Sequence, residues 1–111
     1  MNEAKERNRE AYRQLTPETK TRLRSMLDQL QQLPGTEASL SATEMRFYEL
    51  LNSMKMYTDA QGANPFLAAL EDIRRSEYEK CKDRFVSLSV RNNAVRLFKN
   101  KLQHVIAGWL D

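Results

Sequence analysis

The stretch TPETKTRLRSMLDQLQQLPG, Thr16 to Gly35, contains a helix start, an apolar stripe and a helix stop. Thr16 can cap a helix, and Pro17 suits its first position because that residue needs no backbone N–H. The apolar side chains that follow recur at helical spacing: Leu23, Met26, Leu27, Leu30 and Leu33. Pro34 cannot continue the hydrogen-bond ladder, and Gly35 frees the backbone. The stretch therefore predicts an amphipathic helix that packs one face into a core.

A second helix is expected to start at LSATEM, residues 40–45. Ser41 and Glu44 have the spacing of a capping box, in which each side chain satisfies a backbone N–H of the other residue. Leu40 and Met45 stand at the positions of a hydrophobic staple. The side chains expected to point inward are Tyr48, Leu51, Met54 and Tyr57. This helix should end within residues 59–64.

The third helix should begin at Asn64 and Pro65, which repeat the pattern of a cap followed by proline. If the helix is long, its apolar stripe comprises Phe66, Leu67, Leu70, Ile73, Cys81, Phe85 and Leu88. Residues 85–90 also alternate as a strand would, but no second strand exists to pair with them, so helix is favoured. The two asparagines at 92–93 suggest a kink or a helix cap. A last helix is predicted with the stripe Val95, Phe98, Leu102, Val105, Ile106 and Trp109.

These elements predict an all-α fold, a small bundle of four or five helices with no sheet. The 111 residues are enough for a single helical domain, residues 1–111. Three Gly and three Pro leave little material for the turns of a β-sandwich. Residues 1–15 are only weakly apolar, and we expect a weakly docked N-terminal helix there, either a frayed arm or a helix that docks on a partner.

The residues needed for catalysis are scarce. His104 is the single histidine and Cys81 the single cysteine, so they cannot form the usual zinc set. We find no Gly-rich phosphate loop and no nucleophile elbow. We therefore expect no enzyme, no cofactor and no metal. Cys81 should be a small buried hydrophobic residue. No apolar run reaches the length of a membrane span, and we expect a cytoplasmic protein.

Charge is one-signed over residues 84–110, which hold five cations and no acid, in a chain of net charge +3. Arg84 and Arg91 would share a side of a continuous helix, and Arg96 and Lys99 could extend the same line. Two structural explanations exist: the stems cover the rim of the core, or the guanidinium groups pair with Glu77 or Asp83. The functional explanation is a surface that faces phosphates. Because few aromatics accompany these cations, backbone contact is expected rather than base stacking.

Two segments resemble motifs of a known family. RFVSLSVRNNAV, Arg84 to Val95, is similar to Arg-Phe-Val, four residues, Arg, two residues, Ala-Val. LSATEMR, Leu40 to Arg46, is similar to Leu-Thr-Thr-x-x-Leu-Arg. Both motifs resemble those of the small all-helical subunit of type III CRISPR effector complexes, the Csm type.

The resemblance implies a non-catalytic subunit, present in several copies, that lies along the guide and target RNA and contacts other subunits of the effector complex. By position, Arg46, Arg84 and Arg91 match arginines of the two motifs. Together with Arg96 and Lys99, they are the expected RNA-binding residues. The implied partners are guide RNA, target RNA, the backbone subunits and further copies of the chain, with no membrane.

Two other functions compete with this interpretation. A helical adaptor or scaffold subunit would use its apolar stripes for protein docking and bind no nucleic acid. A helix-turn-helix regulator could be built around the turn at residues 33–45, but the helix that follows is too apolar for a DNA groove. That helix carries only Arg46 and Lys55 for phosphate and base contacts.

Overall fold

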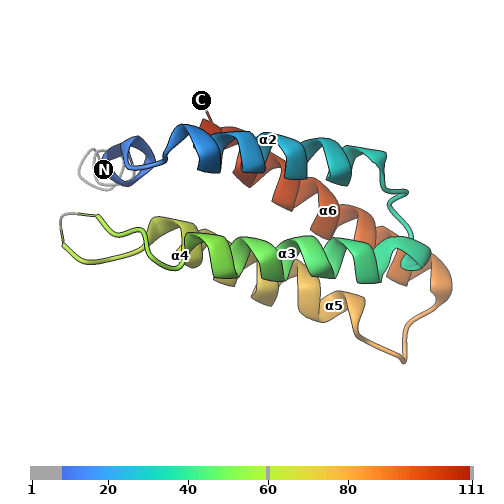
Figure 1. Cartoon of the computed structure of the whole chain (residues 1–111). Helices are drawn as coiled ribbons and strands as arrows, with labels where there is room; N and C mark the ends of the chain where they lie inside the picture. The colour runs from blue at the N-terminus through green and yellow to red at the C-terminus, as the bar shows by residue number, and fades with distance from the viewer. Residues whose placement is uncertain (1–8, 60, 111) are drawn as a thin grey trace.

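Helices form all the regular structure in the part of the chain that the computed structural model describes, residues 9–59 and 61–110 (Figure 1). Residues 9–13 are helical. The elements that follow are α2 (Pro17–Gln32), the 3₁₀ turn η1 (Glu37–Ser39), α3 (Leu40–Met54), α4 (Pro65–Ile73), the π-helical turn η2 (Arg74–Tyr78), α5 (Glu79–Cys81) and α6 (Leu88–Leu110). The predicted all-α bundle without a sheet is confirmed for these residues.

The helices run alternately up and down (Figure 1). Along the chain, α2 runs in one direction, α3 returns, the α4–η2–α5 segment runs out again, and α6 returns. Of these, α6 packs against α2, α3 and the α4–η2–α5 segment. The arrangement is that of an antiparallel bundle with short connections. It brings the connection between α2 and α3 close to the first half of α6.

Two predicted helix starts are confirmed by their caps. The Thr16 hydroxyl accepts a hydrogen bond from the backbone N–H of Thr19, at 3.2 Å. The Asn64 side chain accepts hydrogen bonds from the N–H groups of Phe66 and Leu67, at 3.0 and 3.2 Å. In each case the side chain satisfies N–H groups that have no partner within the helix.

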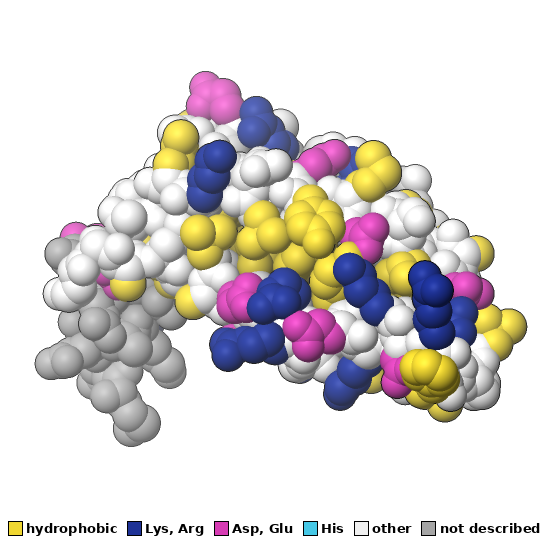
Figure 2. Space-filling view, turned by 90° about the horizontal axis from the view of Figure 1, so that it is seen from below, with side chains coloured by type: hydrophobic (Ala, Val, Ile, Leu, Met, Phe, Trp, Pro, Cys, Tyr) yellow, Lys and Arg dark blue, Asp and Glu magenta, His cyan; other side chains and the backbone are white. Residues whose placement is uncertain are grey.

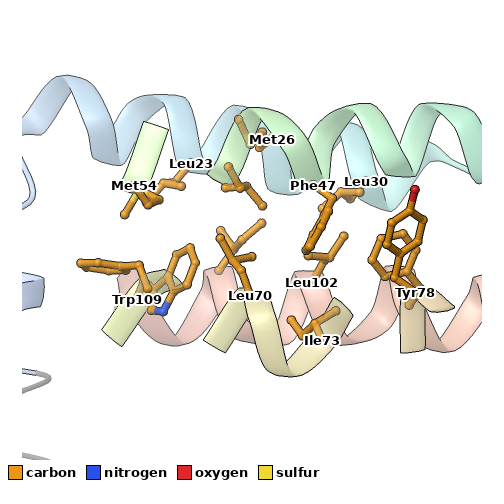
Figure 3. Packing of buried hydrophobic residues seen from close by; sticks show 14 of the residues in the cluster. Leu23, Met26, Leu30, Phe47, Met54, Leu70, Ile73, Tyr78, Leu102 and Trp109 are labelled. Carbon is orange, nitrogen blue, oxygen red and sulfur yellow. The ribbon is translucent and has the colours of Figure 1, made fainter. Parts of the chain in front are cut away.

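The core runs the length of the bundle (Figure 3). Aromatic side chains lie at both ends of the part drawn there. At one end, Tyr78 stacks on Phe98 with ring centroids 5.0 Å apart, and Phe47 meets Phe98 at 5.5 Å. At the other end, Phe66 meets Trp109 edge to face at 4.9 Å. Leucine, isoleucine and methionine side chains from all four helical segments fill the space between, including Leu23, Met26, Leu30, Leu70, Ile73 and Leu102.

Part of the predicted N-terminal helix can be compared with the structure. Residues 1–8 lie outside the described residues. Residues 9–13 are helical, and Ala11 and Leu15 are buried. The ring of Tyr12 lies 5.3 Å from that of Phe66. This short helix therefore contacts the end of the core that Trp109 closes.

The predicted capping box is wrong. The turn Glu37–Ser39 leads directly into α3, which begins at Leu40. The N-cap residue of α3 is therefore Ser39, and no side chain caps the start of the helix. The carboxylate of Glu44 instead accepts a hydrogen bond from the hydroxyl of Tyr78.

The predicted inner face of α3 is wrong by about one position. The buried side chains of α3 are Thr43, Phe47, Leu50 and Met54. Tyr48 is exposed and Leu51 is half-buried, whereas Met54 and Tyr57 are buried as predicted. The error arises because adjacent apolar pairs, at 47–48 and 50–51, allow two helical stripes, and packing against Phe98 selects the first.

The predicted long helix through Phe85 and Leu88 is also wrong. The helical segment that begins at Pro65 ends at Cys81, and residues 82–87 form a connection. The side chains of Phe85 and Leu88 are both exposed. The Asp83 carboxylate accepts a hydrogen bond from the N–H of Phe85, at 2.9 Å, which is a local turn that competes with helix. The Ser87 hydroxyl then accepts the N–H of Val90 at 3.2 Å and starts α6.

The expected kink or cap at Asn92 and Asn93 does not form, because both residues lie inside α6. Their side chains find partners outside the helix ladder. Asn92 Oδ1 accepts the N–H of Glu37 at 2.8 Å, and Asn93 Oδ1 accepts a hydrogen bond from Arg96. Asn92 therefore fastens a neighbouring segment, and Asn93 bonds a side chain of its own helix, so neither interrupts α6.

Candidate nucleic-acid interface

Four of the expected RNA-binding residues lie together, where residues 33–37 cross the first half of α6. We call this set the basic edge: Arg84, Arg91, Arg96 and Lys99. Arg84 and Arg91 line one hollow. Farther along α6, Arg96 and Lys99 contact the connection between α2 and α3. At 1.5 Å per residue, the span from Arg91 to Lys99 along α6 is about 12 Å.

Lys99 binds the carbonyl of the residue that caps the end of α2. Its ammonium nitrogen donates a hydrogen bond to the carbonyl of Leu33, at 2.8 Å. The last carbonyls of a helix lack intrahelical partners and carry partial negative charge, so a cation there is favourable. One of the three ammonium hydrogens is used in this contact, and the residue is half-buried.

Arg91 holds the next part of the connection. Its guanidinium pairs with the carboxylate of Glu37 at 3.0 Å, while Asn92 accepts the N–H of the same glutamate. The Arg91 side chain is 25% exposed and its Nε atom is buried without a partner among the described residues. This pair is one of the two structural explanations considered for the run, although Glu37 is not an acid that the sequence pointed to.

Arg96 lies against the backbone at Gly35. A Cβ at that position would come within 3.0 Å of Arg96 Cγ and 3.2 Å of its Cα. Glycine therefore eases the close approach of the two chain segments here, because a side chain would push Arg96 away by a few tenths of an ångström. The guanidinium group itself is directed to Asn93 Oδ1, and the residue is exposed.

Arg84 lies on the connection of residues 82–87. It is exposed and makes no hydrogen bond or ion pair with the described residues. A hollow of about 390 Å³ lies beside it. The hollow is lined by Glu37, Leu40, Cys81, Lys82, Asp83, Arg84 and Arg91. Arg84 and Arg91 thus line the same hollow, although the continuous helix that was expected to align them is not formed.

Arg46 is not part of the basic edge. It lies between α3 and α2, with its guanidinium 2.6 Å from Gln29 Oε1 and 3.3 Å from the Glu49 carboxylate. Lys101 faces another neighbour of α6, since its ammonium nitrogen is 3.1 Å from the carboxylate of Glu77. The one-signed run is therefore divided among two sides of α6.

Charges of both signs alternate on the face that carries α3 and α5 (Figure 2). Hydrophobic side chains gather along the middle of that face, with Lys, Arg, Asp and Glu on either side. Beside the basic edge, the hollow contains two acids, Glu37 and Asp83, against the cations Lys82, Arg84 and Arg91. Within α6 itself, no acid offsets the cations.

Ion pairs form along the α4–η2 segment. Glu71 pairs with Arg74, whose hydrogen bond lowers the pKa of that carboxyl, and Asp72 lies 3.0 Å from Arg75. Glu77 is buried in η2 and pairs with Lys101 of α6. Its second carboxylate oxygen is buried with no partner among the described residues.

Cys81 is buried as predicted, at 2% exposure. Burial, reinforced by the negative charge of Glu77, raises the pKa of its thiol to about 11. The thiolate needed for nucleophilic chemistry is therefore scarce at neutral pH. His104 is exposed on α6.

Among the residues that the structure describes, His, Cys, Asp and Glu side chains do not converge in groups of three or more that could hold a metal ion. No helix there has the length and apolar character needed to cross a membrane.

No family model, no curated protein and no solved structure matches this chain.

Proposed function

We propose that this chain is a non-catalytic RNA-binding subunit of a larger ribonucleoprotein. The observation that supports it best is the basic edge, where Arg84, Arg91, Arg96 and Lys99 gather from a connection and from α6. Three of these cations lie within about 12 Å along the axis of α6, a spacing that allows contacts with neighbouring phosphates of a nucleic-acid backbone.

The contacts within the basic edge leave room for phosphates. Arg84 has no partner among the described residues, and the reported contact of Lys99 uses one of its three donors. The ion pair of Arg91 with Glu37 is partly exposed and contributes at most about 1 kcal/mol. A phosphate can therefore compete with the Glu37 carboxylate for this guanidinium.

The assembly proposed is the type III CRISPR effector, on the strength of the two motif resemblances described above. In such a complex the chain would lie along guide and target RNA, beside the backbone subunits and further copies of itself. Arg46, which closes the motif at Leu40 to Arg46, bonds Gln29 of α2, so its proposed RNA contact would be separate from the basic edge.

The proposal is tested by fluorescence anisotropy with a short single-stranded RNA, titrated at several salt concentrations. The double variant Arg84→Ala with Arg96→Gln should bind more weakly. The slope of log affinity against log salt should fall by about 1.4, since each lost phosphate contact removes about 0.7.

A matched control removes two exposed cations from the opposite end of the bundle, Arg13→Ala with Lys55→Ala. This control has the same net charge as the test variant and should keep the slope of the unmodified protein. Equal slopes for all three proteins, or no RNA binding by the unmodified protein, would refute the proposal.

A protein-docking adaptor is the second candidate, and the outer face of α3 favours it. Met45 and Tyr48 are exposed there at 57% and 47%, next to the half-buried Leu51. An adaptor that binds no RNA would be impaired by Met45→Ser with Tyr48→Ser and unaffected by changes in the basic edge.

A further inference from the structure

Phe85 stands apart from the other phenylalanines of the chain. It is 99% exposed, whereas the side chains of Phe47, Phe66 and Phe98 are completely buried. Single exposed apolar residues are common, but a fully exposed aromatic ring on a connection is an informative exception. The ring makes no aromatic contact with the described residues, so its place in the fold is not explained by packing.

The connection that carries Phe85 is fixed on both sides of the ring. On one side, the Asp83 carboxylate accepts the N–H of Phe85 at 2.9 Å. On the other, Ser87 starts α6 by accepting the N–H of Val90 at 3.2 Å, and its carbonyl accepts the N–H of Arg91 at 3.0 Å. These bonds present the ring at the end of the bundle on a short connection without glycine or proline.

Cations surround the base of this tip. Arg84 precedes the ring directly, and it lines the hollow of about 390 Å³ together with Arg91 and Lys82. The acids of the hollow are already engaged, Glu37 with Arg91 and Asp83 with the backbone of Phe85. An aromatic ring beside arginines is the combination that binds single-stranded nucleic acid, in which the ring takes a base and the cations take phosphates.

We infer that Phe85 stacks against a nucleobase of single-stranded RNA while Arg84 and Arg91 hold the adjoining phosphate in the hollow. The inference rests on the proposed function and adds two features to it: a preference for unpaired over paired RNA, and a contact to a base. A protein pocket is the other occupant that an exposed ring could enter. Arg84, which directly precedes the ring and has no partner among the described residues, favours RNA, because a protein pocket for phenylalanine would leave this charge unpaired.

The test uses a short single-stranded RNA that contains 2-aminopurine, whose fluorescence is quenched when it stacks on an aromatic ring. Phe85→Ala should lose the quenching and at least about fivefold in affinity, as expected for the loss of one stacked base. Its salt slope should stay unchanged, because no phosphate contact is removed. Since the ring is fully exposed, circular dichroism of the variant should match that of the unmodified protein.

Two further variants separate stacking from a general apolar contact. Phe85→Trp should retain affinity and quenching, whereas Phe85→Leu should behave like Phe85→Ala. A perfectly paired RNA of the same sequence should bind more weakly than the single strand and be indifferent to the Phe85 substitutions.

The failures of the two proposals can be told apart. If the unmodified protein binds RNA with the salt slope expected but Phe85→Ala or Phe85→Leu binds equally well, the stacking inference is overturned and the basic edge stands. The ring would then belong to a protein contact. If the unmodified protein binds no RNA, the proposed function and the inference both fail.

Discussion

Gly35 is the residue at which the α2–α3 connection and α6 come closest. The space that a side chain would occupy there is taken by Arg96, including its Cα at 3.2 Å. A flexible side-chain end could move aside, but a helix backbone cannot move without disturbing its packing. The position of the basic edge relative to the connection therefore depends on the absence of a Cβ at Gly35.

Gly35→Ala should lower the free energy of unfolding by about 1 to 3 kcal/mol, the usual range for overpacking. Gly108→Ala is the control, because a Cβ there meets nothing within 4 Å in α6. That change should be neutral or stabilising by up to about 1 kcal/mol, since alanine favours helix over glycine. Urea unfolding measures both. Equal effects of the two substitutions would contradict the close approach at Gly35.

The Cys81 thiol makes stability depend on pH in the alkaline range. In the folded chain burial keeps its proton, with a pKa of about 11, whereas the unfolded thiol has the ordinary value of 9.0. Because the folded pKa is the higher one, the contribution is complete below pH 9 and is lost as the pH rises toward 11. The unfolded state binds fewer protons in this window, so the free energy of unfolding must fall with pH.

Cys81→Ala should remove this contribution. The difference in unfolding free energy between the unmodified protein and the variant should shrink as the pH rises from 9 to 11. Urea unfolding at several pH values provides the measurement. A difference that stays constant across the window would show that the thiol titrates alike in both states.

At the scale of the elements, local capping explains why some boundaries could be predicted. The starts at Thr16 and Asn64 depend on a side chain and an N–H two or three residues away, so the sequence contains the whole interaction. The end of the third helix was missed because residues 82–87 contain neither glycine nor proline. Its signals, Asp83 and Ser87, are residues that also occur on helix surfaces.

The start of α3 yields a prediction that separates the expected capping box from the observed contacts of Ser39. Ser39 is buried, and its hydroxyl, which has one hydrogen to donate, lies within hydrogen-bond distance of the carbonyl oxygens of Thr36, at 2.9 Å, and of Pro34. Ser39→Ala should cost about 1 kcal/mol or more of unfolding free energy. Ser41 is exposed and makes no cap, so Ser41→Ala should cost less than about 0.5 kcal/mol.

The same urea titration decides between them. A larger loss for Ser41→Ala than for Ser39→Ala would restore the capping box at Ser41 and Glu44 and contradict the 3₁₀ turn that precedes α3.

At the scale of the whole molecule, the basic edge lies where residues 33–37 cross the first half of α6, and hydrophobic side chains gather along the middle of the face drawn in Figure 2. Residue types alone identified the members of the basic edge. Their arrangement could not be predicted, because Arg91 pairs with Glu37 across 54 positions and Lys99 reaches Leu33 across 66. Contacts of that separation arise from the topology of the fold and leave no local pattern.

The exposure of Phe85 could not be predicted from local sequence either. An apolar residue at helical spacing predicts a core position, and only the end of the helix at Cys81 turns the ring outward. The aromatic side chain that suits base stacking was thus counted with the core, and backbone contact alone was expected.

The central claim is that RNA binds along the basic edge, and titration of the ¹⁵N-labelled protein with single-stranded RNA tests it most directly. The account predicts that amide shifts concentrate in residues 33–37 and 82–99, with little change at the exposed positions of α3 around Tyr48. Shifts confined to the α3 face, or none at saturating RNA in low salt, would contradict it.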